Sequence, residues 1–214
     1  MERLTQYSGY IMPQDNLQHF ITGTQLAQVV AVRHTLERSR TRWPECTGAL
    51  YYKMNDNYPA ASWSCVDWYG APKPLHYFAQ DAFSPVAAVI LFEHTDMYGR
   101  DVTLPVYLLD DNLDLENKGW TLYVRVFNSK LEQVAGKEFS GNGNKLMVNK
   151  LGAISLTSKQ TETSPLLFVS EVYSGGKKIF RTFYYMNFEE LKGSLFNMPR
   201  TTLQMVVKGN KVLI

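Results

Sequence analysis

The sequence predicts an α+β chain, with two helices and one apolar strand in residues 1–84 and an antiparallel β-sandwich in residues 85–214. In the first part, apolar residues recur at helical spacing on either side of a short run that is apolar at consecutive positions. After Ser84-Pro85 the pattern changes to short alternating runs separated by turns rich in Gly and Asn. About seven such runs over roughly 130 residues are typical of an immunoglobulin-like sandwich, so we expect two domains.

Composition and charge argue against several classes of function. The formal net charge is +2 over 214 residues, and no run of Lys or Arg offers a surface for nucleic acid or for an anionic membrane. No apolar run reaches the length of a membrane span. The first ten residues lack the basic and apolar regions of a secretory signal. The compartment stays open.

No metal or organic cofactor is expected. The histidines are dispersed along the chain, and Cys46 and Cys65 have no metal-ligand spacing. The two thiols could form a disulfide, but we favour two reduced cysteines packed around the apolar strand.

The first helix is expected over residues 24–42. Thr22 and Gln25 have the spacing of a capping box, and Trp43-Pro44 ends the helix. Helical spacing is shown by Leu26, Val29, Val30, Arg33 and Leu36, of which Leu26, Val29 and Val30 form the expected apolar stripe. The last turns are expected to be solvated and carry the charged residues Glu37, Arg38, Arg40 and Arg42.

An apolar strand is expected over residues 46–54 and a second helix over residues 72–83. The apolar residues of the strand do not alternate with polar ones, which is typical of a parallel strand covered on both faces. The second helix begins with Pro72 and Pro74, which the first turn of a helix tolerates. Its apolar face consists of Leu75, Phe78, Ala79, Ala82 and Phe83.

The strands of the sandwich are expected at Ala87–Glu93, Val102–Leu109, Thr121–Phe127, Lys145–Val148, Leu166–Tyr173, Lys178–Met186 and Leu203–Val207. Thr121–Phe127 alternates most clearly, with Leu122, Val124 and Val126 on one face. We expect that face to lie in the core, and Trp120 to pack there as well.

Residues 48–73 have the composition of a sugar site. After the apolar strand they carry the polar side chains of Asn55 and Asp56, followed by the aromatic rings of Tyr58 and Trp63. Aromatic faces stack on the C–H faces of a pyranose, while amides and carboxylates bind its hydroxyls. The alternative is a buried strand followed by a well-packed loop, because Trp and Tyr usually serve packing.

The same stretch resembles the last barrel strand and the following loop of family 2 glycoside hydrolases, closest to the β-mannosidase-like branch. The positions in register with the pattern of that branch are Gly48, Asn55, Asp56, Pro59, Ser62, Trp63, Ser64, Asp67, Gly70 and Lys73. So many positions in register are more specific than a lone short motif. Tyr52 and Tyr58 stand where the pattern has tryptophan, which leaves the choice of sugar open.

The resemblance implies a fold and an activity. Residues 1–84 would be the C-terminal piece of a glycosidase (β/α)8 barrel, with residues 46–54 as its last strand, and residues 85–214 would be the sandwich that follows. Family 2 enzymes are retaining glycosidases, in which two carboxyl groups about 5–5.5 Å apart act as acid/base and nucleophile. In the family both glutamates precede the last barrel strand, and neither has a counterpart here. Ser170-Glu171 is similar to the nucleophile motif but lies in the sandwich.

The resemblance also indicates the substrate-binding residues. Tyr52 matches the floor of the sugar subsite, and Asn55, Asp56, Tyr58 and Trp63 complete the set. From the residues alone, Asp56 could brace its loop, contact a ligand or act on a proton, and Trp63 could equally be a core residue.

We therefore expect the C-terminal part of a retaining glycosidase for terminal β-linked sugars, with no catalytic residue and no activity by itself. The expected partners are a carbohydrate and either the rest of the barrel or a second copy of the chain. The competing hypothesis is a non-catalytic carbohydrate-binding or structural module.

Overall fold

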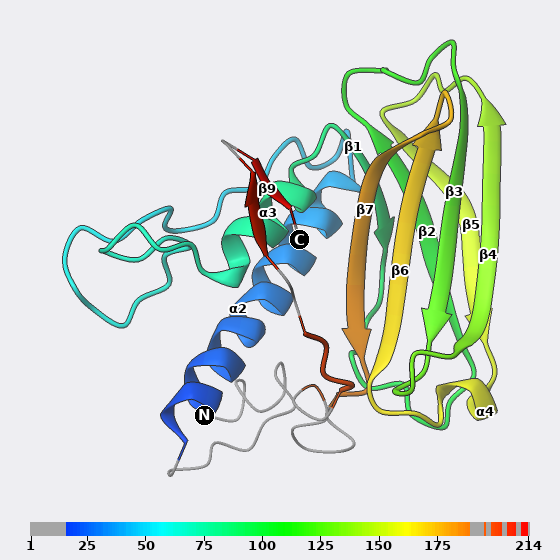
Figure 1. Ribbon diagram of the computed structural model, residues 1–214. Helices are drawn as coiled ribbons and strands as arrows, with labels where there is room; N and C mark the ends of the chain where they lie inside the picture. The colour runs from blue at the N-terminus through cyan, green and yellow to red at the C-terminus, as the bar shows by residue number, and fades with distance from the viewer. Residues whose placement is uncertain (1–15, 189–194, 196–197, 203–204, 209–210, 214) are drawn as a thin grey trace.

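The computed structural model describes residues 16–188, 195, 198–202, 205–208 and 211–213. A β-sandwich forms one side of the molecule, and the helices α2 (Leu17–Arg40) and α3 (Pro74–Ala82) lie beside it (Figure 1). The long loop between the two helices projects away from the sandwich. Within the described residues, no helix has both the length and the apolar character needed to span a bilayer.

Helix α2 begins seven residues before the predicted start at residue 24. Asn16 caps it, because its side-chain oxygen accepts a hydrogen bond from the His19 N–H at 3.0 Å. The predicted capping box is wrong, since the Thr22 hydroxyl donates to the Gln18 carbonyl inside the helix. The helix ends at Arg40, close to the predicted end. Helix α3 agrees with the predicted helix 72–83, and Leu75 is buried on its inner face.

The strand predicted over residues 46–54 is absent. These residues have no regular secondary structure. The nearest β-type pairing is an isolated bridge between Asn55 and Val66. Leu50, expected to be covered, is fully exposed. A parallel strand needs a hydrogen-bonded neighbour, and no strand among the described residues lies beside this segment.

The sandwich that the sequence predicts is confirmed. One sheet has the order β1-β2-β5 and the other β4-β3-β6-β7, and all neighbouring strands are antiparallel. The strands are β1 (Val86–Ile90), β2 (Val102–Asp110), β3 (Gly119–Phe127), β4 (Gln133–Asn142), β5 (Val148–Leu156), β6 (Leu166–Ser174) and β7 (Lys177–Met186). The short helix α4 (Ser158–Thr161) follows β5, and β8 (Val206–Lys208) pairs with β9 (Lys211–Leu213).

Two strand predictions are wrong. Strand β4 was not expected, because it is an edge strand with mostly exposed side chains and a glycine at 136 and 141. The run Lys145–Val148 forms no strand of its own, because only its last residue, Val148, is in a strand, as the first residue of β5. The last predicted strand, Leu203–Val207, includes residues 203 and 204, which lie outside the described residues; β8 begins at Val206.

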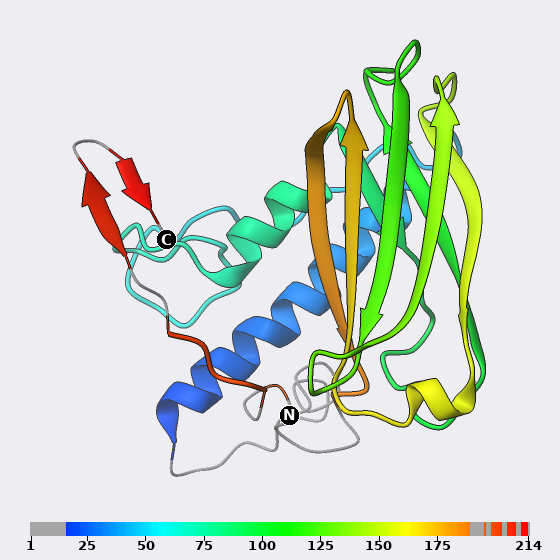
Figure 2. The ribbon, with the colours of Figure 1, turned by 45° about the vertical axis from the view of Figure 1, so that its right-hand side comes forward.

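The core lies between the two sheets. As predicted, Leu122, Val124 and Val126 are fully buried there, and Trp120 packs against the same cluster. All five residues of β1 are buried, although β1 lies at the edge of its sheet. Figure 2 shows the C-terminal half of α2 behind the edge of the sandwich that carries β7.

Candidate functional site

The loop between α2 and α3 carries every residue predicted to contact a sugar. It is held together around Asp56, whose side chain is almost fully buried. Ser64 Oγ donates to Asp56 Oδ2 at 2.7 Å, Ser62 Oγ donates to Oδ1, and the Lys53 ammonium lies 2.9 Å from Oδ1. Lys73 also donates to Ser64 Oγ at 2.8 Å. Four members of the sequence pattern thus form one polar network.

The network keeps the Asp56 carboxylate ionised. The hydrogen bond from Ser62, followed by the contacts of Lys53 and Ser64, holds the pKa of Asp56 well below its usual range. Because both carboxylate oxygens already have partners within the loop, the geometry favours a bracing role for Asp56. Transfer of a proton to a substrate would require a carboxyl that is easier to protonate.

The aromatic candidates face solvent. Tyr52 is 75% exposed, Tyr58 59% and Trp63 74%, so the alternative of Trp63 as a core residue is wrong. Asn55 is exposed beside them. The Lys53 ammonium lies 5.6 Å from the centre of the Tyr58 ring and joins that ring to Asp56. Exposed aromatic faces are suited to stacking on a ligand, and the same loop also exposes Trp68 and Tyr69.

The inner side of the loop packs on the helices. Cys65 is buried in a small core with Val29 of α2 and Leu75 of α3. Its sulfur lies 3.4 Å from the Tyr51 hydroxyl, and this hydrogen bond, with burial, raises the pKa of Tyr51 to about 12. Cys46 and Cys65 are both free thiols, as favoured from the sequence. Within the described residues, no cluster has the ligands for a metal ion.

A buried ion pair joins α2 to the sandwich and was not predicted. Arg33 Nε lies 2.7 Å from Glu37 Oε1, and both side chains are buried. Arg33 also donates to the Phe183 carbonyl at 2.6 Å and to Thr182 Oγ1 at 2.8 Å, and the Tyr184 hydroxyl donates to Glu37 at 3.1 Å. Burial raises the pKa of Glu37, and the Arg33 guanidinium opposes that rise. The prediction of a solvated helix end is therefore wrong for Glu37.

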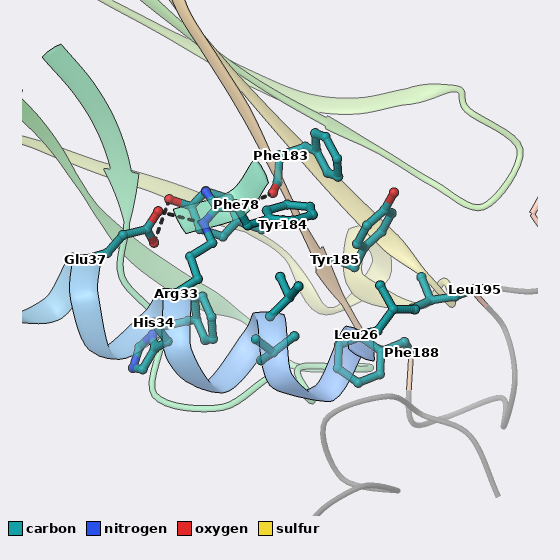
Figure 3. Close-up of a pocket in the computed structure, with 13 residues that line it drawn as sticks. Leu26, Arg33, His34, Glu37, Phe78, Phe183, Tyr184, Tyr185, Phe188 and Leu195 are labelled. Atoms are coloured by element: carbon teal, nitrogen blue, oxygen red, sulfur yellow. Dashed lines mark hydrogen bonds and ion pairs between the residues drawn. The ribbon is translucent and has the colours of Figure 1, made fainter. Parts of the chain in front are cut away.

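This pair lies beside a cavity of about 40 Å³ between α2 and β7 (Figure 3). Apolar side chains from α2, α3 and β7 form most of its wall. The guanidinium of Arg33 stacks 3.9 Å from the centre of the Tyr184 ring. The signal in the sequence was a polar pair at i and i+4 within an otherwise apolar stripe, but its partners lie far along the chain.

Ser170-Glu171 lies in β6, as expected, apart from the loop. Glu171 accepts from Arg125 at 2.8 Å and from Lys178 at 3.1 Å on the sandwich. These contacts lower the pKa of Glu171 although burial opposes them. The carboxylate of Glu171 therefore serves in ion pairs that join neighbouring strands of the sandwich.

No family model matches the chain. Beta-mannosidase B of Aspergillus niger is 33% identical over 84 residues, which are 38% of this chain and 10% of that protein. Beta-mannosidase B of Aspergillus terreus is 32% identical over the same shares. The matched region therefore covers about a tenth of these curated relatives.

Two solved structures share the fold. The β-D-mannosidase of Dictyoglomus thermophilum has a TM-score of 0.64 at 21% identity, covering 89% of this chain and 23% of that one. The exo-chitosanase CsxA of Amycolatopsis orientalis has a TM-score of 0.60 at 21% identity, covering 86% of this chain and 21% of that one. The likeness in fold thus extends beyond the stretch that carries the likeness in sequence. The chain is thus similar to curated beta-mannosidases in sequence over 84 residues, and over most of its length it shares its fold with parts of a β-D-mannosidase and an exo-chitosanase.

Proposed function

We propose that this chain supplies one wall of the sugar site of a retaining glycosidase that acts on terminal β-linked sugars such as mannosides. The contacts to sugar come from Tyr52, Asn55, Tyr58 and Trp63, and Asp56 braces the loop that presents them. The observation that carries the proposal is the exposure of these aromatic faces on a loop with a buried polar network. A loop held in one conformation loses little entropy when it binds a ligand.

The catalytic carboxyl pair comes from another segment. A retaining mechanism requires two carboxyl groups about 5–5.5 Å apart with free access to the glycosidic bond. In the loop, the Asp56 oxygens are occupied, and Asp67 accepts a hydrogen bond from the Ala71 N–H at 2.8 Å. We therefore propose that this loop binds sugar without acting on it, because both carboxylates nearest to its aromatic residues already have partners.

We further propose that residues 1–84 belong to a (β/α)8 barrel, with residues 46–54 as its last strand. This segment has the apolar character of a barrel strand but lacks a neighbour, so it becomes a strand only when the adjoining barrel strands pair with it. The exposed apolar side chains that these strands would cover include Leu50 and Met54. The supporting sandwich consists of β1 to β7, between Val86 and Met186, whereas β8 and β9 form a separate two-stranded sheet.

A chimera tests this function. In the β-D-mannosidase of Dictyoglomus thermophilum, the aligned segment is replaced by residues 48–73 of this chain, and hydrolysis of 4-nitrophenyl β-D-mannopyranoside is measured. We expect an active chimera in which Tyr52→Ala and Trp63→Ala each lower kcat/KM by about tenfold or more, because a ring stacked in the site is worth about 1–2 kcal/mol.

The matched control is Tyr69→Ala, an exposed aromatic of the same loop that is not assigned to the sugar. A folded chimera in which all three substitutions have the same effect on kcat/KM would contradict the assignment of the site.

The second candidate is a non-catalytic carbohydrate-binding module. It is favoured by the same exposed aromatic rings together with the occupied carboxylates. Micromolar binding of methyl β-D-mannopyranoside by the chain alone, without other barrel strands, would support this alternative.

A further inference from the structure

Helix α2 connects the sandwich to the sugar loop through two different faces. On the loop side, Gln28 Nε2 donates to the Trp63 carbonyl at 2.6 Å. Val29, which packs against Cys65, also lines the cavity beside Arg33 and lies between the two faces. On the sandwich side lies the Arg33–Glu37 pair. Since successive residues of a helix are rotated by about 100°, Gln28 and Arg33 point roughly 140° apart. A shift of the helix on the sandwich therefore moves the anchor of Trp63.

The Arg33–Glu37 pair determines where α2 lies on the sandwich. Most side chains around the pair are apolar and their contacts are non-directional; other directional contacts of α2 lie at its last turn, where Arg40 donates to the Ser84 carbonyl and to Asp111. The hydrogen bonds of the guanidinium to Thr182 and Phe183, and of Tyr184 to Glu37, have fixed directions. They are satisfied in one register of the helix only.

A contribution to stability alone does not explain such a pair. Replacing a buried ion pair by apolar residues of similar size is often neutral or stabilising, whereas its directional bonds can specify one arrangement. Here the directional bonds of the pair also specify the position of the sugar loop, because the loop has few contacts with the helices besides those of Gln28 and Cys65. Gln28 and the small core around Cys65 are the contacts that transmit it.

We propose that the Arg33–Glu37 pair is a positioning element for the sugar loop. It fixes α2 on β7, and α2 in turn fixes the backbone at Trp63 through Gln28. That Trp63 contacts sugar rests on the proposed function above. The coupling between the Arg33–Glu37 pair and the position of Trp63 does not depend on it.

The test uses the full chain labelled with 5-fluorotryptophan, in which the Trp63 fluorine resonance is assigned by its loss in Trp63→Phe. Glu37→Gln keeps the size of the side chain and removes its charge. Thr182→Val removes the acceptor of Arg33 on the sandwich, together with the hydrogen bond that Thr182 donates to Asp81 of α3 at 3.3 Å, and serves if Glu37→Gln does not fold. The control is Glu93→Gln, which breaks the exposed ion pair between Arg38 of the same helix and Glu93 in the segment after β1.

We expect Glu37→Gln and Thr182→Val to shift the Trp63 resonance of the folded protein, and Glu93→Gln to leave it in place. The dissociation constant for methyl β-D-mannopyranoside should rise by roughly threefold or more in the first two variants. When Gln28→Ala is combined with Glu37→Gln, the effects should be non-additive, because both act through the same contact.

A merely structural pair would lower the melting temperature without changing the folded protein. An unchanged Trp63 resonance and an unchanged affinity in both Glu37→Gln and Thr182→Val would overturn the proposal. If the unmutated chain shows no binding of methyl β-D-mannopyranoside, the proposed function is wrong for this chain, and the Trp63 resonance alone decides the coupling.

Discussion

Asp56 illustrates how the surroundings of one residue decide its role. A carboxylate next to exposed aromatic rings has the chemistry of a sugar ligand. Here it accepts hydrogen bonds from Ser62 and Ser64 and pairs with Lys53, which leaves it buried and ionised. Its contribution to a sugar site is therefore indirect, through the shape of the loop.

The first prediction concerns the response of this loop to pH. A carboxyl group with a depressed folded-state pKa stabilises the folded loop above its unfolded pKa of about 4, and this contribution is lost as pH falls toward the folded value. The loop should therefore open in acid. The measurement is a shift of the Trp63 fluorine resonance below about pH 4. Asp56→Asn should lower the stability of the loop at neutral pH and abolish this acid transition.

Asp67→Asn is the matched control, because Asp67 lies in the same loop and accepts one backbone hydrogen bond from Ala71. It should retain the acid transition. A transition that persists unchanged in Asp56→Asn would assign it to another group.

At the residue scale, the sequence identified the loop but not all of its chemistry. The pattern from Gly48 to Lys73 includes the residues that form the polar network, since these side chains are near neighbours in the chain. It could not reveal that Glu37 is buried. A charge at a helix end is usually solvated, and the contact with Tyr184 depends on how the helix packs on a distant strand.

At the scale of elements, the sequence predicted those whose burial follows from their own pattern. Strand β3 alternates in sequence and in burial. Strand β4 does not alternate, because pairing with β3 defines it rather than a buried face of its own. Segment 46–54 is the opposite case, in which an apolar pattern has no strand to pair with. Helix α2 begins earlier than expected because Asn16 supplies the cap.

A second prediction tests the turn after β4. Gly143 has a φ of +91°, and a Cβ placed there would collide with the Glu116 carbonyl oxygen. Its own N–H donates to the Lys118 carbonyl at 2.9 Å, so the backbone cannot move away without losing that bond. Gly143→Ala should lower the free energy of unfolding by about 1–3 kcal/mol in a denaturant titration.

The control is Gly175→Ala in the turn between β6 and β7. Gly175 also has a positive φ, of +57°, but no atom lies within 4 Å of an added Cβ. The cost there should be limited to about 1 kcal/mol of backbone strain. Equal losses at both positions would show that the collision with Glu116 is relieved without cost.

At the scale of the whole molecule, the two parts of the chain differ in how completely they are covered. The sandwich has its own core between two sheets. The helices and their loop share a small core and leave large apolar side chains in solvent. We therefore predict a boundary at residues 84/85 between an autonomous sandwich and a part that depends on its surroundings.

Hydrogen exchange on a dilute sample measures this difference. Backbone amides of β2, β3 and β6 should exchange slowly, and those of residues 46–62 should exchange orders of magnitude faster, because few of them are bonded in regular structure. At higher concentration, protection of residues 46–62 should increase if the exposed segment pairs with a second copy. Slow exchange over 46–62 in a strictly monomeric sample would mean that the first part completes its own fold.

The most direct test of a sugar-facing loop is a titration of the full chain with methyl β-D-mannopyranoside, followed by the resonances of individual residues. We predict weak, millimolar binding, since most of a sugar pocket would come from other barrel strands. The shifts should be confined to Tyr52, Asn55, Tyr58 and Trp63 and should disappear in a Tyr52→Ala, Trp63→Ala double variant. Shifts that lie on the sandwich, or micromolar binding that survives the double variant, would contradict the account.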